Sequence, residues 1–148
     1  MATIVVGVDG SEASLAALQW AADEARLRGS RLVAVHVWAA PYAPAMPGIM
    51  EPAGLPIDRD VIQQAAAEAV DAWLGEAAAT LEGVEVEAAV AEGEAAEALV
   101  ERSEGAELLV VGSRGHGRLA GALLGSISQK AAQHARCPVV IVHPPRKD

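Results

Sequence analysis

A chain of 148 residues has the usual length of one domain and can bury a core without disulfides or metals. Its formal net charge of -9 disfavours nucleic acids and anionic membranes as partners bound by general charge attraction. A single cysteine, Cys137, excludes an internal disulfide and favours a reducing compartment. The N-terminus has no basic region and no apolar run approaches about 20 residues, so we expect a cytoplasmic protein without a membrane span.

Strands and helices are predicted to alternate from the N-terminus. Thr3 to Val8 is a β-branched run typical of a strand buried on both faces. Ser11 is a suitable N-cap for a helix that runs to about Arg28, and Gly29 is a suitable stop. The stripe expected to face the core is Leu15, Leu18, Ala21, Ala22 and Ala25.

A second apolar strand is predicted over Arg31–Trp38, where His36 is expected to be a packed structural residue. The segment Ala39–Pro56 holds five prolines, which prevent regular structure. Its length favours either a functional flap or a disordered insertion.

The second half of the chain continues the alternation. An amphipathic helix is predicted over Asp58–Leu81, and an alternating strand over Val84–Val90 belongs at a sheet edge. The remaining elements are a helix over Gly93–Ser103, a strand over Leu108–Val111, a helix from Gly125 to about Arg136 and a strand over Pro138–Val142. This order predicts an α/β fold in one domain spanning residues 1–148, with a doubly wound parallel sheet and helices on both faces. The ligand crevice of such a sheet lies where the winding reverses.

A glycine-rich stretch joins the fourth strand to the last helix. Its pattern is Gly112-x2-Gly115-x9-Gly125-Ser126. Glycines let the backbone approach an anion, and the first N–H groups of the helix have no internal partner. No G-x-x-x-x-G-K-[ST] motif occurs, and G-V-D-G-S after the first strand lacks the G-x-G-x-x-G spacing. The flanking strand and helix favour phosphate binding over a loop whose glycines only make turns.

Four segments resemble the universal stress protein family over essentially the whole chain. They are V-G-V-D-G-S, V-V-G-S-R-G-H-G, L-G-S-I-S and C-P-V-V-I-V. The G-x2-G-x9-G-[ST] pattern is similar to that family's nucleotide-binding signature. The resemblance implies five parallel strands in order 3-2-1-4-5, with ATP and Mg²⁺ at their carboxyl edge. It also implies a homodimer, and pairing of Pro138–Val142 with its copy would cover the backbone groups of an edge strand.

The resemblance assigns the site residue by residue. Phosphate and ribose contacts correspond to Gly112, Gly115, Gly125, Ser126 and Ser128, with Ile127 between the two serines. Asp9 corresponds to a carboxylate near the adenosine and the metal, and Val37 to a position whose backbone meets adenine. The loop is lined by Ser113, Arg114, His116, Gly117 and Arg118. Alternatively, Asp9 only caps the first helix and the two arginines are solvated surface charges, although arginines suit a triphosphate.

The predicted function is an ATP-binding stress-response regulator, non-catalytic or a very slow ATPase, that acts through nucleotide-dependent contacts within a dimer or with an unknown protein partner. Paired carboxylates, a nucleophile–base pair and a loop lysine are not evident, so rapid phosphoryl transfer has no visible apparatus. Two alternatives stay open. One is a genuine ATPase or nucleotidyl-transfer enzyme that uses Asp9 or His116, and the other is a partner-binding protein in which nucleotide is incidental.

Overall fold

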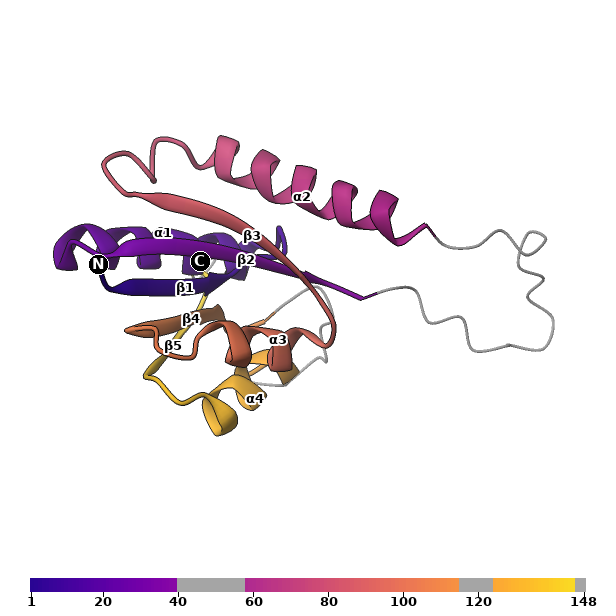
Figure 1. Ribbon diagram of the computed structural model, residues 1–148. Coiled ribbons are helices and arrows are strands. Elements are labelled where there is room, and N and C mark those ends of the chain that lie inside the picture. Colours follow the sequence, from indigo (N-terminus) through magenta and orange to yellow (C-terminus); the bar gives the residue numbers. More distant parts are fainter. Residues whose placement is uncertain (40–57, 115–123, 146–148) are drawn as a thin grey trace.

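Five parallel strands form one sheet in the order β3-β2-β1-β4-β5 (Figure 1). The computed structural model describes residues 1–39, 58–114 and 124–145. The strands are β1 (Thr3–Gly7), β2 (Arg31–Trp38), β3 (Val86–Glu92), β4 (Leu108–Gly112) and β5 (Val139–Val142). The helices are α1 (Glu12–Arg28), α2 (Arg59–Glu76), α3 (Ala95–Arg102) and α4 (Ser126–His134). The predicted fold class and strand order are confirmed.

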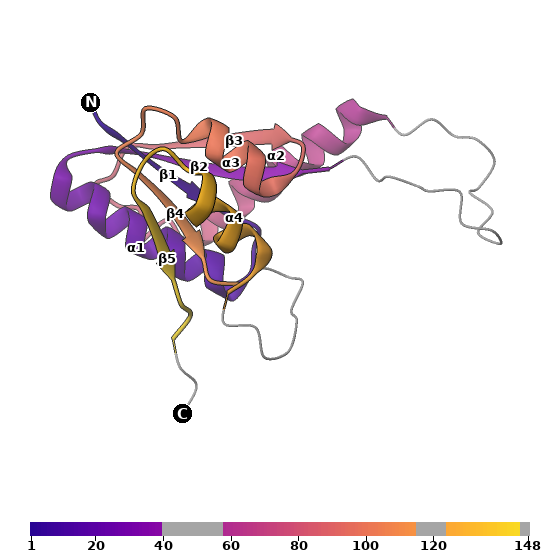
Figure 2. The same cartoon turned by 90° about the horizontal axis from the view of Figure 1, so that it is seen from below.

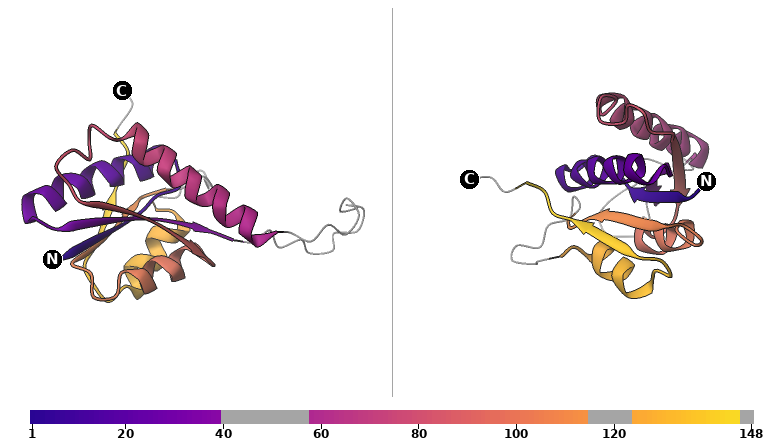
Figure 3. Two further views of the ribbon diagram at one scale, coloured as in Figure 1. Left: turned by 45° about the horizontal axis from the view of Figure 1, so that its top comes forward. Right: turned by 90° about the vertical axis from the view of Figure 1, so that its left-hand side faces the viewer.

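The helices cover both faces of the sheet, with α1 and α2 on one face and α3 and α4 on the other (Figure 3). Neighbouring residues of a strand therefore enter different cores, because their side chains alternate across the sheet. In β1, Ile4 and Val6 join the core under α1 and α2, while Val5 joins the core that contains Leu99 of α3. None of these three β1 side chains is more than 2% exposed. Their burial on both faces explains the continuous apolar run read from the sequence.

The start of α1 lies close to the sheet because its inward residues are small. Ser11 is the N-cap, and its Oγ accepts the N–H of Ser14 at 3.2 Å. Ala13, Ser14 and Ala17 face the sheet together with most of the predicted stripe. Leu15 was expected on that stripe, but it is 38% exposed, so this prediction was wrong. Ser14 takes the inward position at this turn of the helix, and the next residue, Leu15, points outward.

α2 ends at Glu76, five residues before the predicted end at Leu81, and hydrogen-bonded turns follow it. The segment that follows α2 is held by a tertiary contact with α1. The guanidinium of Arg26 donates to the carbonyl oxygens of Thr80 at 2.8 Å and Glu82 at 2.9 Å. These carbonyls are therefore satisfied outside a helix. Leu81 still packs against the core under α1 and α2, as its apolar spacing predicted.

The two sheet edges differ in chemistry. β3 is an edge strand as predicted, begins two residues later than expected, and exposes Glu87, which pairs with Arg31 at 3.4 Å. β5 is the other edge (Figure 2), and all of its residues are apolar and half-buried. Beyond Ala39, the predicted proline-rich loop Ala39–Pro56 lies outside the described residues. Among the helices described, none is long and apolar enough to cross a membrane.

Candidate functional site

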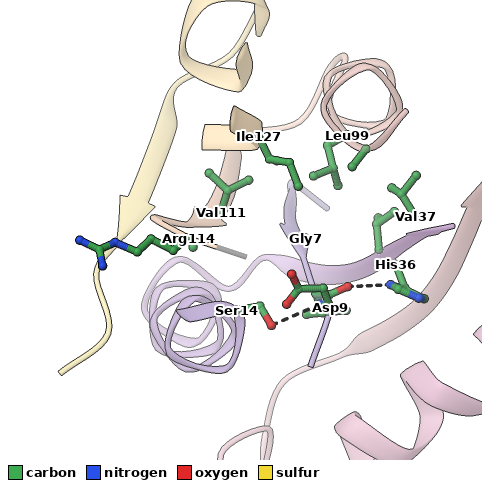
Figure 4. A pocket seen from close by; sticks show the side chains of 13 residues that line it. Gly7, Asp9, Ser14, His36, Val37, Leu99, Val111, Arg114 and Ile127 are labelled. Atoms are coloured by element: carbon green, nitrogen blue, oxygen red, sulfur yellow. Dashed lines mark hydrogen bonds between the residues drawn. The ribbon is translucent and has the colours of Figure 1, made fainter. Parts of the chain in front are cut away.

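The winding of the sheet reverses between β1 and β4, which are neighbours although α1, β2, α2, β3 and α3 separate them in the chain. Helix α1, which follows β1, lies on one face, and α4, which follows β4, lies on the other. A cavity of about 230 Å³ opens at the carboxyl ends of these strands and of β2 (Figure 4). It lies at the switch point where a doubly wound sheet binds its ligand. The predicted crevice is therefore present.

One wall of the cavity is aliphatic. Val37 of β2, Val111 of β4, Leu99 of α3 and Ile127 of α4 contribute to it. Leu99 lies directly against β1 because Gly7 has no side chain: a Cβ there would meet Leu99 Cδ1 at 2.9 Å. The predicted site residues Val37 and Ile127 thus share one apolar surface, which would exclude water from one side of a ligand.

The opposite rim carries Asp9, in the turn between β1 and α1. Its Oδ1 accepts the N–H of Ser11 at 2.8 Å, and its own N–H donates to Ser14 Oγ at 3.2 Å. Asp9 therefore stabilises the turn, while Ser11 caps the helix. The alternative that Asp9 caps the first helix is wrong, because Ser11 is the N-cap, and the Asp9 carboxylate lines the cavity.

The geometry of strand β2 directs the main chain of Val37 towards the cavity. Val35 O accepts the N–H of Val8 at 2.9 Å, so the polar backbone groups of Val35 point towards β1. The backbone N–H and C=O groups of successive residues point to opposite sides of a strand, so those of Val37, two residues after Val35, also point towards the β1 side. Because β1 ends at Gly7, they project beyond it towards the cavity that Val37 lines.

His36 also lines the cavity and was not predicted as a site residue. Its Nδ1 lies 3.0 Å from Val8 O, and its ring packs edge-to-face against Trp73 with centroids 4.9 Å apart. It is thus the packed residue that the sequence predicted, at the border of the site. Its place in the chain directly before Val37 was the one signal that could have drawn attention to it.

The end of β4 is fixed by contacts that involve Gly112 and Ser113. A Cβ on Gly112 would lie 2.8 Å from the carbonyl carbon of Ala13, so only glycine fits. Ser113 O accepts the N–H of Gly125 at 2.6 Å, which joins β4 to the start of α4. The Ser113 side chain is fully buried, and within the described part of the chain its Oγ has no hydrogen-bond partner.

The start of α4 presents its first turn without a side-chain cap. Gly125 is the N-cap residue, and Ser126 is exposed. The predicted ligand donor Ser128 is instead 1% exposed, and its Oγ lies 3.0 Å from Gly125 O and 3.3 Å from Ser113 O. Its hydroxyl therefore holds the β4–α4 connection together. Sequence reasoning assigned Ser128 a ligand contact and did not detect this internal bond.

Arg114 is exposed at the cavity border, and Gly115, His116, Gly117 and Arg118 lie outside the described residues. Where the structure describes the chain, no group of three or more His, Cys, Asp or Glu side chains is arranged to hold a metal ion. The residues that the structure brings together are Asp9, Val37, Gly112, Arg114 and Ile127 around the cavity, with Ser113, Gly125, Ser126 and Ser128 at the β4–α4 connection.

The strand order and the crevice define a doubly wound α/β protein with a site at the switch point. The chain belongs to the universal stress protein family, whose sequence model matches residues 1–143. It is 41% identical over 140 residues to Universal stress protein Rv2623 of Mycobacterium tuberculosis (strain ATCC 25618 / H37Rv), a match that covers 95% of this chain and 44% of that protein. The chain therefore spans less than half the length of this curated relative.

Solved structures of the same family share the fold. A crystal structure of a universal stress protein in complex with cAMP is 30% identical, has a TM-score of 0.67, and is matched over 97% of this chain and 98% of its own. UspA from Lactobacillus plantarum superimposes with a TM-score of 0.76 at 23% identity, over 95% of this chain and 97% of its own. The family resemblance read from the sequence motifs is confirmed.

Proposed function

We propose that this protein is an ATP-binding regulator whose nucleotide site is the crevice between β1 and β4. The observation that carries the proposal is the cavity of about 230 Å³ beside the helix start that follows the G-x2-G-x9-G-[ST] pattern. The relative crystallised with cAMP supports an adenine nucleotide as the ligand. The aliphatic wall offers a dry surface for a base, and the helix start offers N–H donors for phosphate.

Each side of the crevice would serve one part of the nucleotide. The base would lie against Val37 and the aliphatic wall, and the phosphates would lie near Gly125 and Ser126, with Arg114 as countercharge. A Kd of about 1 μM requires about -8.2 kcal/mol. Helix-terminus charge contributes about 0.3–1 kcal/mol and each hydrogen bond to a charged group about 1.5–3 kcal/mol. Several donors and burial of the base are therefore needed together.

The cavity lining favours binding over rapid turnover. In the part that the structure describes, the lining contains one carboxylate, Asp9, and no lysine. The Asp9 carboxylate is the hard oxygen ligand that suits Mg²⁺ bound to the phosphates. It is already engaged by the N–H of Ser11, which favours a structural role over general-base catalysis. We expect phosphate release from ATP to be absent or very slow, and unchanged by Asp9→Asn beyond its effect on binding.

Calorimetric titration with ATP tests the site. Gly125→Val places a branched side chain at the helix start, where the backbone φ of -72° accepts it. We expect at least tenfold weaker ATP binding, corresponding to about 1.4 kcal/mol, with the fold preserved in circular dichroism. Gly75→Val is the matched control, because a Cβ at Gly75 has no atom within 4 Å. Equal affinity of the Gly125→Val variant and the wild type would refute the site.

We also propose that two copies of the chain pair through the edge strand Pro138–Val142. Pro138 is exposed, and every residue of β5 itself is apolar and half-buried, so this edge offers backbone groups and apolar area to a partner strand. A two-fold axis would pair the edge with its own copy and close the assembly.

A further inference from the structure

The hydrogen-bond ladder between β1 and β2 ends at a carbonyl oxygen that interacts with a side chain. Val8 N–H donates to Val35 O at 2.9 Å, as in a continuing parallel ladder. The next bond of such a ladder would join Val37 N–H to Val8 O. The described structure has no such bond, and the His36 ring holds Val8 O at 3.0 Å in its place. The last carbonyl of the ladder thus interacts with a side chain.

This substitution leaves the Val37 main chain directed at the cavity. Val8, His36 and Val37 all line the cavity, so the exchange of partners takes place at its border. If Val8 O accepted the Val37 N–H, the ladder would be one bond longer and that donor would be used inside the sheet. An N–H directed into an apolar pocket is the kind of group that reads the edge of a base.

The His36 ring is itself held from the side of α2. It packs edge-to-face on Trp73 with an interplanar angle of 86°. Trp73 also contacts the turn after β1, because a Cβ on Gly10 would meet the Trp73 ring at 2.8 Å. A carbonyl oxygen only accepts hydrogen bonds, so Nδ1 of His36 carries the hydrogen that it donates to Val8 O. The contact therefore requires a hydrogen on Nδ1 and the ring orientation that Trp73 holds.

We propose that His36 is a positioning residue of the nucleotide site, which keeps the Val37 N–H available to the ligand by holding Val8 O out of the ladder. The inference rests on the proposed function, since it concerns how that crevice recognises the base. It assigns part of the ligand affinity to Trp73 of α2, which does not line the cavity but orients the His36 ring.

Two variants separate the hydrogen bond from the packing. His36→Asn keeps a donor nitrogen at the same branch position and removes the ring. His36→Phe keeps an aromatic ring against Trp73 and removes the donor. We expect His36→Phe to bind adenosine and ATP about tenfold more weakly, by the same factor for both ligands, and His36→Asn to bind both within a factor of about three of the wild type.

The equal loss for adenosine and ATP is the informative readout, because a change at the phosphate end would not affect adenosine. Affinities are measured by calorimetry, and thermal unfolding without ligand confirms that each variant folds. Wild-type affinity in His36→Phe, or a loss in His36→Asn as large as in His36→Phe, would overturn the role of His36. Failure of the wild-type protein to bind either ligand would instead refute the proposed function.

Discussion

Three glycines stand where any side chain would collide with the framework of the crevice. At Gly7 the obstacle is Leu99, at Gly10 it is Trp73, and at Gly112 it is the backbone of Ala13. The first two obstacles are side chains that can shift by changing rotamer. A backbone atom in the first turns of a helix has far less freedom, so the clash at Gly112 cannot be relieved by a change of rotamer.

Gly112→Ala should lower the free energy of unfolding by about 1–3 kcal/mol, the usual range for an overpacked site. The added Cβ would lie 2.8 Å from the carbonyl carbon of Ala13 and 2.9 Å from its oxygen, which forces α1 away from β4. Urea unfolding followed by circular dichroism measures the change. Gly75→Ala, which adds a methyl group in open space, should be neutral or stabilising by up to about 1 kcal/mol. Equal stabilities of the two variants would disprove the clash.

Glu107 should make the stability of the fold sensitive to acid. Its carboxyl pKa is lowered, first because Arg28 donates to it at 2.6 Å and second because Ser30 Oγ donates to it at 2.7 Å. A lowered pKa in the folded state means that stability is fully present above the ordinary value of 4.5 and is lost as the pH falls through the folded value.

Glu107→Gln should therefore melt at a lower temperature near neutral pH and lose less of its stability than the wild type on acidification. The measurement is the melting temperature between neutral pH and about pH 3. Glu85→Gln alters an exposed glutamate and should follow the wild-type profile. Parallel profiles of the wild type and Glu107→Gln would contradict the assignment.

At the level of elements, the alternation of strands and helices could be predicted because each depends on local pattern. Ser11, Gly29 and the apolar runs give direct signals, and all five strands were located to within a few residues. The switch point followed from the strand order, which brought Asp9 beside Gly112 as expected. The end of α2 at Glu76 was not predicted, because the apolar spacing in the sequence continues beyond it to Leu81.

Contacts between elements also explain what was missed in the site. His36 contacts Val8 and Trp73, and Ser128 donates to the carbonyl oxygen of Ser113, all of which are distant in sequence. Neither set of contacts produces a recurring residue pattern in the sequence. The sequence thus predicted the crevice at the switch point, while the partners of individual side chains required the fold.

Arg26→Ala should loosen the segment between α2 and β3. The guanidinium donates to two carbonyl groups of that segment, on Thr80 and Glu82, and to the Asp23 carboxylate at 2.9 Å. Because the side chain is 41% exposed, we expect a loss of only about 1 kcal/mol in urea unfolding. Arg59→Ala removes a single ion pair from a side chain that is 69% exposed and should change stability by less than about 0.5 kcal/mol. Equal losses in the two variants would exclude the bridging role of Arg26.

At the scale of the whole molecule, the proposed dimer depends on the free edge of β5. In parallel pairing with β4, the carbonyls of Pro138 and Val142 accept from Leu109 and Ser113. The backbone groups of Ile141, one position away from Val142, therefore point outward. Proline is tolerated at such edge positions, so Ile141→Pro should fold and yet remove a donor that a partner strand needs.

Sedimentation velocity should find the wild type and Ile141→Val as dimers and Ile141→Pro as a monomer. The Ile141→Val control retains an apolar β-branched side chain and the backbone N–H. A monomeric wild type would refute the dimer, and a dimeric Ile141→Pro with native circular dichroism would show that the copies pair elsewhere.

Because few residues of α2 are buried, its amides should exchange hydrogen faster than those of β1. Of its 18 residues only Ala66 and Val70 are buried, whereas Ile4, Val5 and Val6 of β1 are at most 2% exposed. Amides of α2 should exchange through local opening that does not need global unfolding, and those of β1 only when the whole fold opens. The end of α2 that carries Trp73 rests on His36, so its protection factors should exceed those of the first turn and increase further when nucleotide binds.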